Sequence, residues 1–161
     1  LIKSYFNLHG IQSRSFNGSL LWEPWEVTKK DQTPYKVFTP FYKNAILKPP
    51  RFPEGVPDLN FTSKHSFISI DELNLIPEIP WYKGMEFWKI GEEGAQETLK
   101  IFLKEGINDY KQGRNYPHQK KVSRLSPYLH FGEISPNQVW YSASLSPDLH
   151  GNLDTFLAEL G

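Results

Sequence analysis

The sequence contains no cysteine and a single methionine among its 161 residues. Without thiols the chain can form neither a disulfide framework nor a thiolate metal site, and it is compatible with a reducing compartment. Eighteen basic and eighteen acidic residues give a formal net charge of zero. No overall field therefore draws the chain to nucleic acid, and any such attraction must come from local patches.

Long apolar runs and an initiator methionine are also absent. The first ten residues, LIKSYFNLHG, are too short and too often interrupted by polar residues for a signal peptide or a membrane span, so we expect an internal start, a cytoplasmic location and no membrane partner. His9, His65 and His150 each stand without a second ligand at metal spacing, and we expect no metal site. Neither a nucleophile constellation nor a GxxxxGK stretch occurs.

The first 47 residues have the pattern expected at the edge of an α/β domain. A helix ends at Gly10, residues 11–16 alternate as in a strand, and residues 20–22 indicate another short strand. Thr39 followed by Pro40 predicts the N-cap and first residue of a helix.

Residues 48–90 are rich in proline and read as a long connection, because proline fixes φ and removes a backbone donor too often for regular elements to persist. Its aromatic residues give it enough apolar surface to pack onto neighbours. Trp81 and Trp88 would suit redox or stacking roles, but we predict that both serve packing. The prolines are Pro49, Pro50, Pro53, Pro57, Pro77 and Pro80.

From Gly91 the chain reads as helical. Apolar and small residues recur every three or four positions and predict one face of a helix of about five turns. Ser135-Pro136 predicts a capped helix reaching about Leu145, and either Ser146-Pro147 or Gly151-Asn152 begins the next one. The residues of the apolar face are Ala95, Leu99, Phe102, Leu103, Gly106 and Tyr110.

A basic segment follows this face, since Tyr110–Gly132 contains no acidic residue. Ser123 and Ser126 add hydroxyl groups, and a loop adds free backbone N–H groups, so the simplest partner is a phosphate-bearing ligand. The alternative is a solvated basic loop without a ligand. The cationic residues are Lys111, Arg114, Lys120, Lys121 and Arg124.

Three motifs, in order, resemble the DNA photolyase and cryptochrome family. EPWEVTKKDQTPYKVFTPFYKNA (23–45) is similar to the end of that family's α/β domain, and IGEEGAQETLKIFL (90–103) to its next helix. Tyr110 with Arg114, followed by SRLSPYLHFGEISPNQVW (123–140), resembles the start of the flavin-binding domain. The overall likeness is greatest to a microbial class I cyclobutane pyrimidine dimer photolyase, of which this chain would be a fragment.

The resemblance implies a fold class and a domain order. An α/β edge is followed by a mainly α part. Residues 1–47 would be the end of the Rossmann-like α/β domain, residues 48–90 the interdomain connector, and residues 91–161 the first helices of the all-α FAD-binding domain.

The resemblance also implies cofactor contacts. Many members have Thr where this chain has Val122, which removes one hydroxyl contact, and relatives often have Trp where it has Phe156 against the cofactor. Tyr110 matches a tyrosine that contacts FAD. The loop that wraps the FAD phosphates is matched by Ser123, Arg124, Leu125 and Ser126, with Leu125 as a backbone-directed contact.

Two further matches concern DNA and catalysis. Glu159 matches the glutamate that faces the lesion pocket, where a carboxyl group can hydrogen-bond or share a proton with the pyrimidine carbonyl oxygens. Its alternative is a solvated helix carboxylate. Arg114 matches an arginine that supports the loop or reaches toward DNA.

The implied function is light-driven repair of cyclobutane pyrimidine dimers in DNA by electron transfer from reduced FAD. The full-length protein would be a monomer with a folate or deazaflavin antenna chromophore, and the fragment alone would be inactive. One alternative is a cryptochrome, an FAD-containing blue-light photoreceptor without repair activity. Another is a helical fragment with only a packing role.

Overall fold

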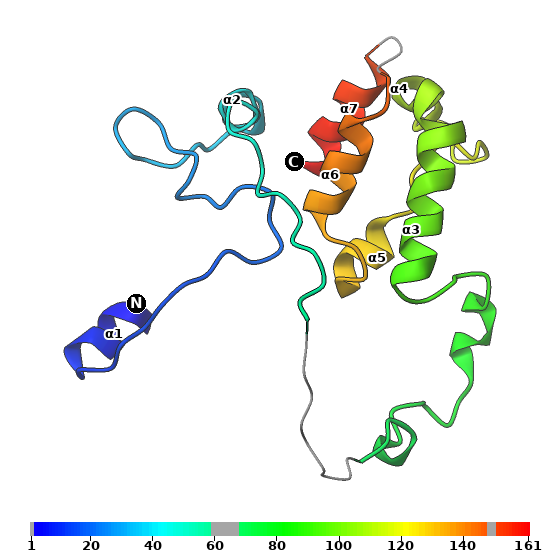
Figure 1. Ribbon diagram of the computed structural model, residues 1–161, viewed down its shortest axis with the longest axis horizontal. Helices are drawn as coiled ribbons and strands as arrows, with labels where there is room; N and C mark the ends of the chain where they lie inside the picture. The colour runs from blue at the N-terminus through cyan, green and yellow to red at the C-terminus, as the bar shows by residue number, and fades with distance from the viewer. Residues whose placement is uncertain (1, 59–67, 148–150) are drawn as a thin grey trace.

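The computed structural model describes residues 2–58, 68–147 and 151–161 (Figure 1). Regular structure in these residues is helical, and they contain no β-strand. The α-helices are α1 (Ile2–Leu8), α2 (Phe38–Ala45), α3 (Glu92–Ile101), α4 (Tyr110–Gly113), α5 (Ser126–Phe131), α6 (Pro136–Ser144) and α7 (Asn152–Leu160). Short 3₁₀ turns occur at Asp71–Leu73, Trp81–Met85 and Ile107–Asp109, and a π turn at Phe102–Gly106.

Helices α3 to α7 pack together as one helical body, which encloses the larger of two apolar cores (Figure 1). The predicted apolar face is confirmed, since Ala95, Leu99, Phe102 and Tyr110 are all buried. The full core comprises Ala95, Leu99, Phe102, Ile107, Tyr110, Leu125, Tyr128, Ile134, Val139, Ala143, Leu153, Phe156 and Leu157.

The predicted five-turn helix is not uniformly α-helical. After α3 the chain widens into the π turn and tightens into a 3₁₀ turn before α4. A Cβ built on Gly106 would lie 2.7 Å from Cδ2 of Phe102, so the ring occupies the space that a side chain would need. Phe102 and Tyr110 stay on the same buried side through this change of winding.

Helix starts in the body follow the sequence signals. Ser135 caps α6 through a capping box: its Oγ accepts from the N–H of Gln138 at 3.1 Å, and its own N–H donates to Oε1 of Gln138 at 2.8 Å. Helix α7 begins at Asn152, the second of its two predicted starts, directly after Gly151 at φ 72°.

The predicted α/β edge is not confirmed. Residues 11–16 and 20–22 form no strand, so both strand predictions are wrong; one isolated antiparallel bridge joins Thr28 to Pro34. A strand is stabilised by the ladder it makes with a neighbour, and no other described segment offers these residues one. Alternation of side chains therefore does not produce a strand here.

The start of α2 also differs from its prediction. The helix begins at Phe38, its N-cap is Val37, and no side chain caps it. Thr39 and Pro40 consequently lie inside the first turn. Proline is tolerated there because the first backbone N–H groups of a helix have no partner within it.

The N-terminal region rests on the helical body through α6. The indole rings of Trp22 and Trp140 meet edge to face at 5.1 Å. Nδ2 of the buried Asn137 donates to the carbonyl of Arg51 at 2.7 Å, and the Tyr141 hydroxyl donates to the carbonyl of Pro50 at 2.7 Å. These contacts define the junction between the two regions.

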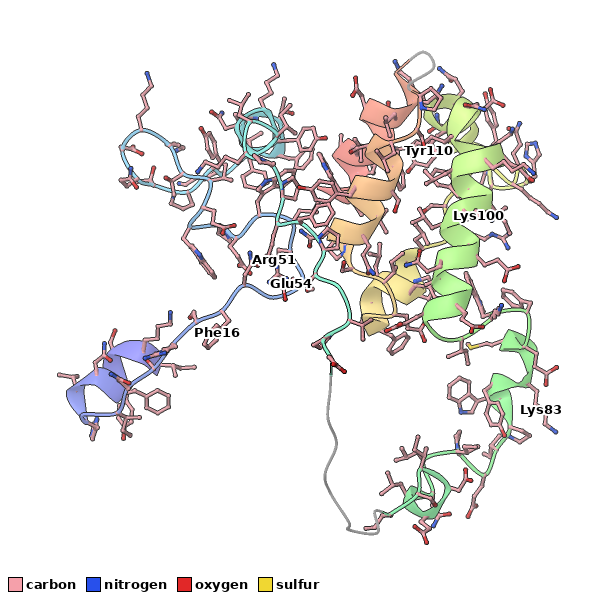
Figure 2. All side chains as sticks on the ribbon, in the orientation of Figure 1. Phe16, Arg51, Glu54, Lys83, Lys100 and Tyr110 are labelled. Carbon is pink, nitrogen blue, oxygen red and sulfur yellow. The ribbon has the colours of Figure 1, made fainter. Side chains whose placement is uncertain are left out.

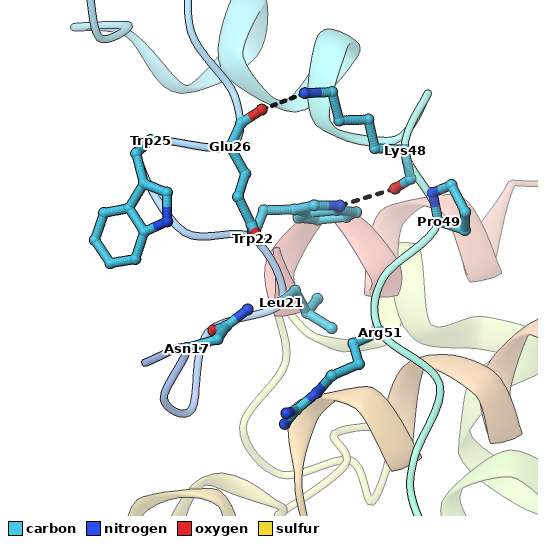
Figure 3. Close-up of a pocket in the computed structure, with 8 residues that line it drawn as sticks. All are labelled: Asn17, Leu21, Trp22, Trp25, Glu26, Lys48, Pro49 and Arg51. Carbon is cyan, nitrogen blue, oxygen red and sulfur yellow. Dashed lines mark hydrogen bonds between the residues drawn. The ribbon is translucent and has the colours of Figure 1, made fainter. Parts of the chain in front are cut away.

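Trp22 also organises a hollow of about 460 Å³ on the N-terminal side of the junction (Figure 3). Its indole N–H donates to the carbonyl of Lys48 at 2.8 Å, and Nζ of Lys48 donates to the carbonyl of Glu26. The connection is thereby tied to the segment before α2.

In the connection, the two tryptophans have different surroundings. Trp81 is 65% exposed, so the prediction that it packs is wrong. Trp88 is half-buried and meets Tyr128 edge to face at 5.9 Å, which confirms packing for that residue. Trp88 differs because the chain here has reached the helical body.

Candidate functional site

The serine-containing loop, residues 122–126, leads directly into α5. Arg124 has φ 54°, a left-handed conformation that is uncommon for a residue with a side chain. This turn buries the Leu125 side chain in the core and leaves Arg124 and Ser126 exposed on either side of it. The Leu125 N–H donates to Oγ of Ser123 at 3.4 Å, so that amide is engaged within the loop.

A cavity of about 580 Å³ opens against this loop, and aromatic residues of the connection form its other wall. A second hollow of about 270 Å³ lies between the loop and α3, and the two share Val122, Ser123 and Arg124. The larger cavity is lined by Phe87, Trp88, Val122, Ser123, Arg124, Leu125, Ser126 and Pro127.

The aromatic wall is held in place by α5 and the turn that follows it. The Tyr128 hydroxyl donates to the carbonyl of Lys89 at 3.1 Å, beside its ring contact with Trp88. The N–H of Gly91 donates to Oε1 of Glu133 at 3.0 Å. The cavity therefore has a loop wall and an aromatic wall fixed to the same helix.

A second cluster forms where α4 faces α7, with Tyr110 at the start of α4 (Figure 2). Arg114 forms an ion pair with Glu159, and its guanidinium carbon lies 5.9 Å from the ring centre of Tyr110. The Tyr110 ring meets that of Phe156 edge to face at 5.4 Å. The structure thus brings together four of the predicted site residues.

Electrostatics within the Tyr110–Glu159 cluster follow from these contacts. Its hydrogen bond to Glu159 raises the pKa of the Arg114 guanidinium. Burial raises the pKa of the Tyr110 phenol, the Glu159 charge raises it further, and the nearby Arg114 opposes both. Tyr110 is therefore a neutral phenol, and Arg114 a permanent cation, throughout the physiological range.

Phe102 lies between the cluster and the loop. Its ring contacts Phe156 at 4.8 Å and Tyr110 at 5.6 Å, and its side chain also lines the second hollow with Val122 and Ser123. The predicted cofactor residues consequently fall into two groups, the serine-containing loop and the pair Tyr110 and Phe156, and Phe102 contacts or lines both. No sequence pattern indicates this division, because it depends on the packing of α3 against the loop.

The basic segment is partly neutralised. Arg114 is paired with Glu159, and Nζ of Lys121 lies 2.8 Å from Oδ2 of Asp109. In the part of the chain that the structure describes, Lys111, Lys120 and Arg124 form no ion pair. The positive charge available to an anionic ligand beside the loop is therefore that of Arg124 and Lys120.

No group of three possible metal ligands occurs in the described ranges. Nδ1 of His9 is paired with the carbonyl of Tyr5 at 2.9 Å, while His65 and His150 lie outside those ranges. None of the helices described is long and apolar enough to cross a membrane.

Comparison with known proteins gives consistent results. The family model described as DNA photolyase matches residues 1–58. A deoxyribodipyrimidine photo-lyase of Alkalihalophilus pseudofirmus is 35% identical over 153 residues, 91% of this chain and 31% of that protein. One from Agrobacterium fabrum is 34% identical over 138 residues, covering 83% and 29%. The chain belongs to the DNA photolyase family.

Two other members of the photolyase family add to this result. Cryptochrome-1 of Arabidopsis thaliana is 31% identical over 146 residues, 86% of this chain and 21% of that protein. The crystal structure of a bacterial class III photolyase from Agrobacterium tumefaciens superposes with a TM-score of 0.78 at 29% identity, covering 99% of this chain and 34% of that one. The chain thus spans about a third or less of these relatives.

For a photolyase, the serine-containing loop fits the phosphate part of FAD. Ser123 and Ser126 offer hydroxyl groups, Arg124 offers an unpaired cation, and Trp88 and Phe87 offer aromatic surface on the facing wall. Sequence reasoning missed both aromatic residues as cavity-lining groups. Their place in a proline-rich connection gave no signal, since only the fold carries them to the loop.

Proposed function

We propose that the full-length protein containing this chain is a deoxyribodipyrimidine photo-lyase, which repairs cyclobutane pyrimidine dimers in DNA under light. The observation that carries this proposal is the Arg114–Glu159 ion pair beside Tyr110 and Phe156. Phe102 contacts both of these rings and also lines the hollow beside the serine-containing loop. This arrangement places a carboxylate and a cation next to an apolar wall, near a loop suited to phosphate. FAD in its reduced, light-excited form would supply the electron that splits the dimer.

Each residue has a defined part in this proposal. Ser123, Ser126 and Arg124 would hold the FAD phosphates by charge-assisted hydrogen bonds. Tyr110 and Phe156 would limit access of water to the cofactor. Glu159 would hydrogen-bond the pyrimidine carbonyl oxygens, and Arg114 would hold that carboxylate in place and face the DNA backbone.

The domain assignment is part of the same proposal. Residues 1–47 would complete an α/β domain, residues 48–90 would connect it to the next, and residues 91–161 would begin the helical FAD-binding domain. The likeness to the class III photolyase over nearly the whole chain supports this order. Helical packing from α3 onward fits a boundary in the connection. A folate or deazaflavin antenna, a monomeric state and a cytoplasmic location complete the proposal.

The test uses the full-length protein, its absorption spectrum and illumination with dimer-containing DNA. Bound flavin and light-dependent loss of dimers are expected, with repair reduced at least tenfold in Glu159→Gln and flavin binding reduced in Ser126→Ala. The matched control is Asp154→Asn, an exposed carboxylate on the same helix as Glu159. The 161-residue chain alone should neither retain flavin nor repair DNA. Stoichiometric flavin on this chain would contradict that expectation.

A second candidate is a cryptochrome photoreceptor, which the similarity to Cryptochrome-1 over most of the chain supports. The same experiment separates the two functions. Bound flavin that responds to light while dimers stay intact would replace repair by photoreception. Absence of flavin from the full-length protein would remove both.

A further inference from the structure

Helix α4 is too short to hold its own orientation. It has four residues, and it follows a π turn and a 3₁₀ turn rather than a regular helix. Isolated helices this short are unstable, so their direction must come from tertiary contacts. Yet α4 carries Tyr110 and immediately precedes Arg114, both of which must meet residues of α7.

Asn152, the first residue of α7, supplies such a contact with both ends of its amide. Oδ1 accepts from the N–H of Lys111 at 2.9 Å, and Nδ2 donates to the carbonyl of Asn108 at 2.6 Å. Asn152 as a whole residue is 6% exposed. An asparagine can satisfy an N–H and a carbonyl at once, whereas aspartate offers acceptors alone and leucine offers neither.

The Asn152 contact and the Arg114–Glu159 ion pair join the same two helices at different levels. Asn152, at the start of α7, accepts a hydrogen bond from the backbone of α4. The Arg114–Glu159 pair forms about two turns further along α7. Between them, Tyr110 and Phe156 meet edge to face. If α4 rotated or slid along α7, both the ring contact and the ion pair would be disturbed. The hydrogen bonds of Asn152 to the backbone of α4 and the preceding turn oppose such a movement.

We infer that Asn152 is a positioning residue for the proposed photolyase site, holding α4 against α7 so that Arg114 reaches Glu159. This inference rests on the proposed function. Asn152 touches neither Arg114 nor Glu159 in these hydrogen bonds, and it acts through the backbone of residues 108–111. Its sequence signal was that of a helix start, whereas its side chain serves the neighbouring helix.

The test is Asn152→Asp in the full-length protein. The carboxylate keeps the acceptor for the Lys111 N–H, and a negative charge is favourable at a helix N-terminus, which favours retention of the fold. Its second oxygen faces the Asn108 carbonyl, so that bond is lost. The matched control is Gln112→Glu, the same amide-to-carboxylate exchange at an exposed position of α4.

Light-driven repair at saturating DNA should fall about tenfold in Asn152→Asp and stay within twofold of wild type in Gln112→Glu. In a Glu159→Gln background, Asn152→Asp should cost less than twofold, because residues that act through one interaction are not additive. Without flavin, the Arg114 Nη1–H resonance should lose hydrogen-exchange protection in Asn152→Asp, because Nη1 pairs with Glu159. The melting temperature of each variant shows whether it is folded. If Asn152→Asp is not folded, Asn152→Ser is used in its place.

Repair at the wild-type level in Asn152→Asp, or an undiminished loss in the Glu159→Gln background, would overturn the positioning role. Either result leaves the proposed function intact. If instead wild type and Glu159→Gln show the same lack of light-dependent repair, the proposed function fails and this inference fails with it.

Discussion

The N-terminal region, residues 2–58, and the helical body, residues 91–161, differ in the source of their order. The body encloses a core of buried residues contributed by α3 to α7. The apolar cluster of the N-terminal region has only four buried residues, Leu21, Trp22, Val27 and Ala45, and Trp140 of α6 packs against it. The body is therefore stabilised by its own burial of apolar surface, and the N-terminal region by its contact with the body.

This contrast also separates two kinds of sequence signal. A helix makes its hydrogen bonds within its own segment, so α6 and α7 begin where predicted and α3 covers the first part of its predicted helix. A strand needs hydrogen bonds to a neighbouring strand, so residues 11–16 and 20–22 form no strand despite their alternating pattern. The comparison of the two regions thus shows that helices are easier than strands to predict from local sequence.

The largest expected effect compares a buried and an exposed phenylalanine. Phe156→Ala should lower the free energy of unfolding by about 3–5 kcal/mol, because it opens a cavity between Phe102 and Tyr110. Phe16→Ala, at a residue 80% exposed, should change it by about 0.5 kcal/mol or less. Urea unfolding measures both. Equal losses would mean that the N-terminal region contains a core of its own.

Removal of the junction should come next in size. Trp140→Ala deletes the edge-to-face contact with Trp22 and should cost about 2 kcal/mol, since Trp140 is half-buried. Limited proteolysis should cut residues before Pro49 faster, while the far-ultraviolet circular dichroism of the helices persists. The exposed Trp25, changed to Ala, is the control. Unchanged cleavage in Trp140→Ala would show that the N-terminal region does not depend on α6.

Helix capping gives a smaller and sharper comparison. Ser135→Ala should cost about 1 kcal/mol, because it removes the acceptor for the Gln138 N–H in the capping box. Thr39→Ala should cost about 0.5 kcal/mol or less, because Thr39 caps nothing. Thermal unfolding compares the pair. A loss at Thr39 as large as that at Ser135 would restore Thr39 as the N-cap of α2.

The smallest effect concerns alkaline pH. Burial raises the pKa of Tyr110 above its ordinary value of 10.0, so the folded state holds this proton more tightly than the unfolded chain does. The resulting stabilisation is complete below pH 10 and is lost as pH rises through the raised pKa. Tyr42, whose pKa is raised by burial and by the Asp154 charge, contributes the same trend from the N-terminal region.

Tyr110→Phe and Tyr42→Phe show how much of the stability lost at alkaline pH comes from each region. Each should flatten the decline of unfolding free energy above pH 10, measured by denaturant titration at successive pH values. A decline unaltered in Tyr110→Phe would show that its phenol ionises as readily in the folded state as in the unfolded one.

The candidate site was predictable in part. The resemblance grouped Tyr110 with Arg114 in one motif, and the structure places the Arg114 guanidinium over the Tyr110 ring. Their meeting with Phe156 and Glu159 did not follow, because it depends on how α7 packs across α4. The aromatic wall of Phe87 and Trp88 and the bridge made by Asn152 were missed for the same reason.

The sequence by itself determined the helices that carry their own caps and periodicity, the basic segment and the family to which the chain belongs. These depend on residues close together in the chain, or on motifs whose order along the chain can be read from the sequence. Only the tertiary structure decided which charges pair, which aromatic residues face the serine-containing loop, and that the alternating residues near the start form no strand. Each of these outcomes depends on a partner far away in sequence, and no local pattern specifies where that partner will lie.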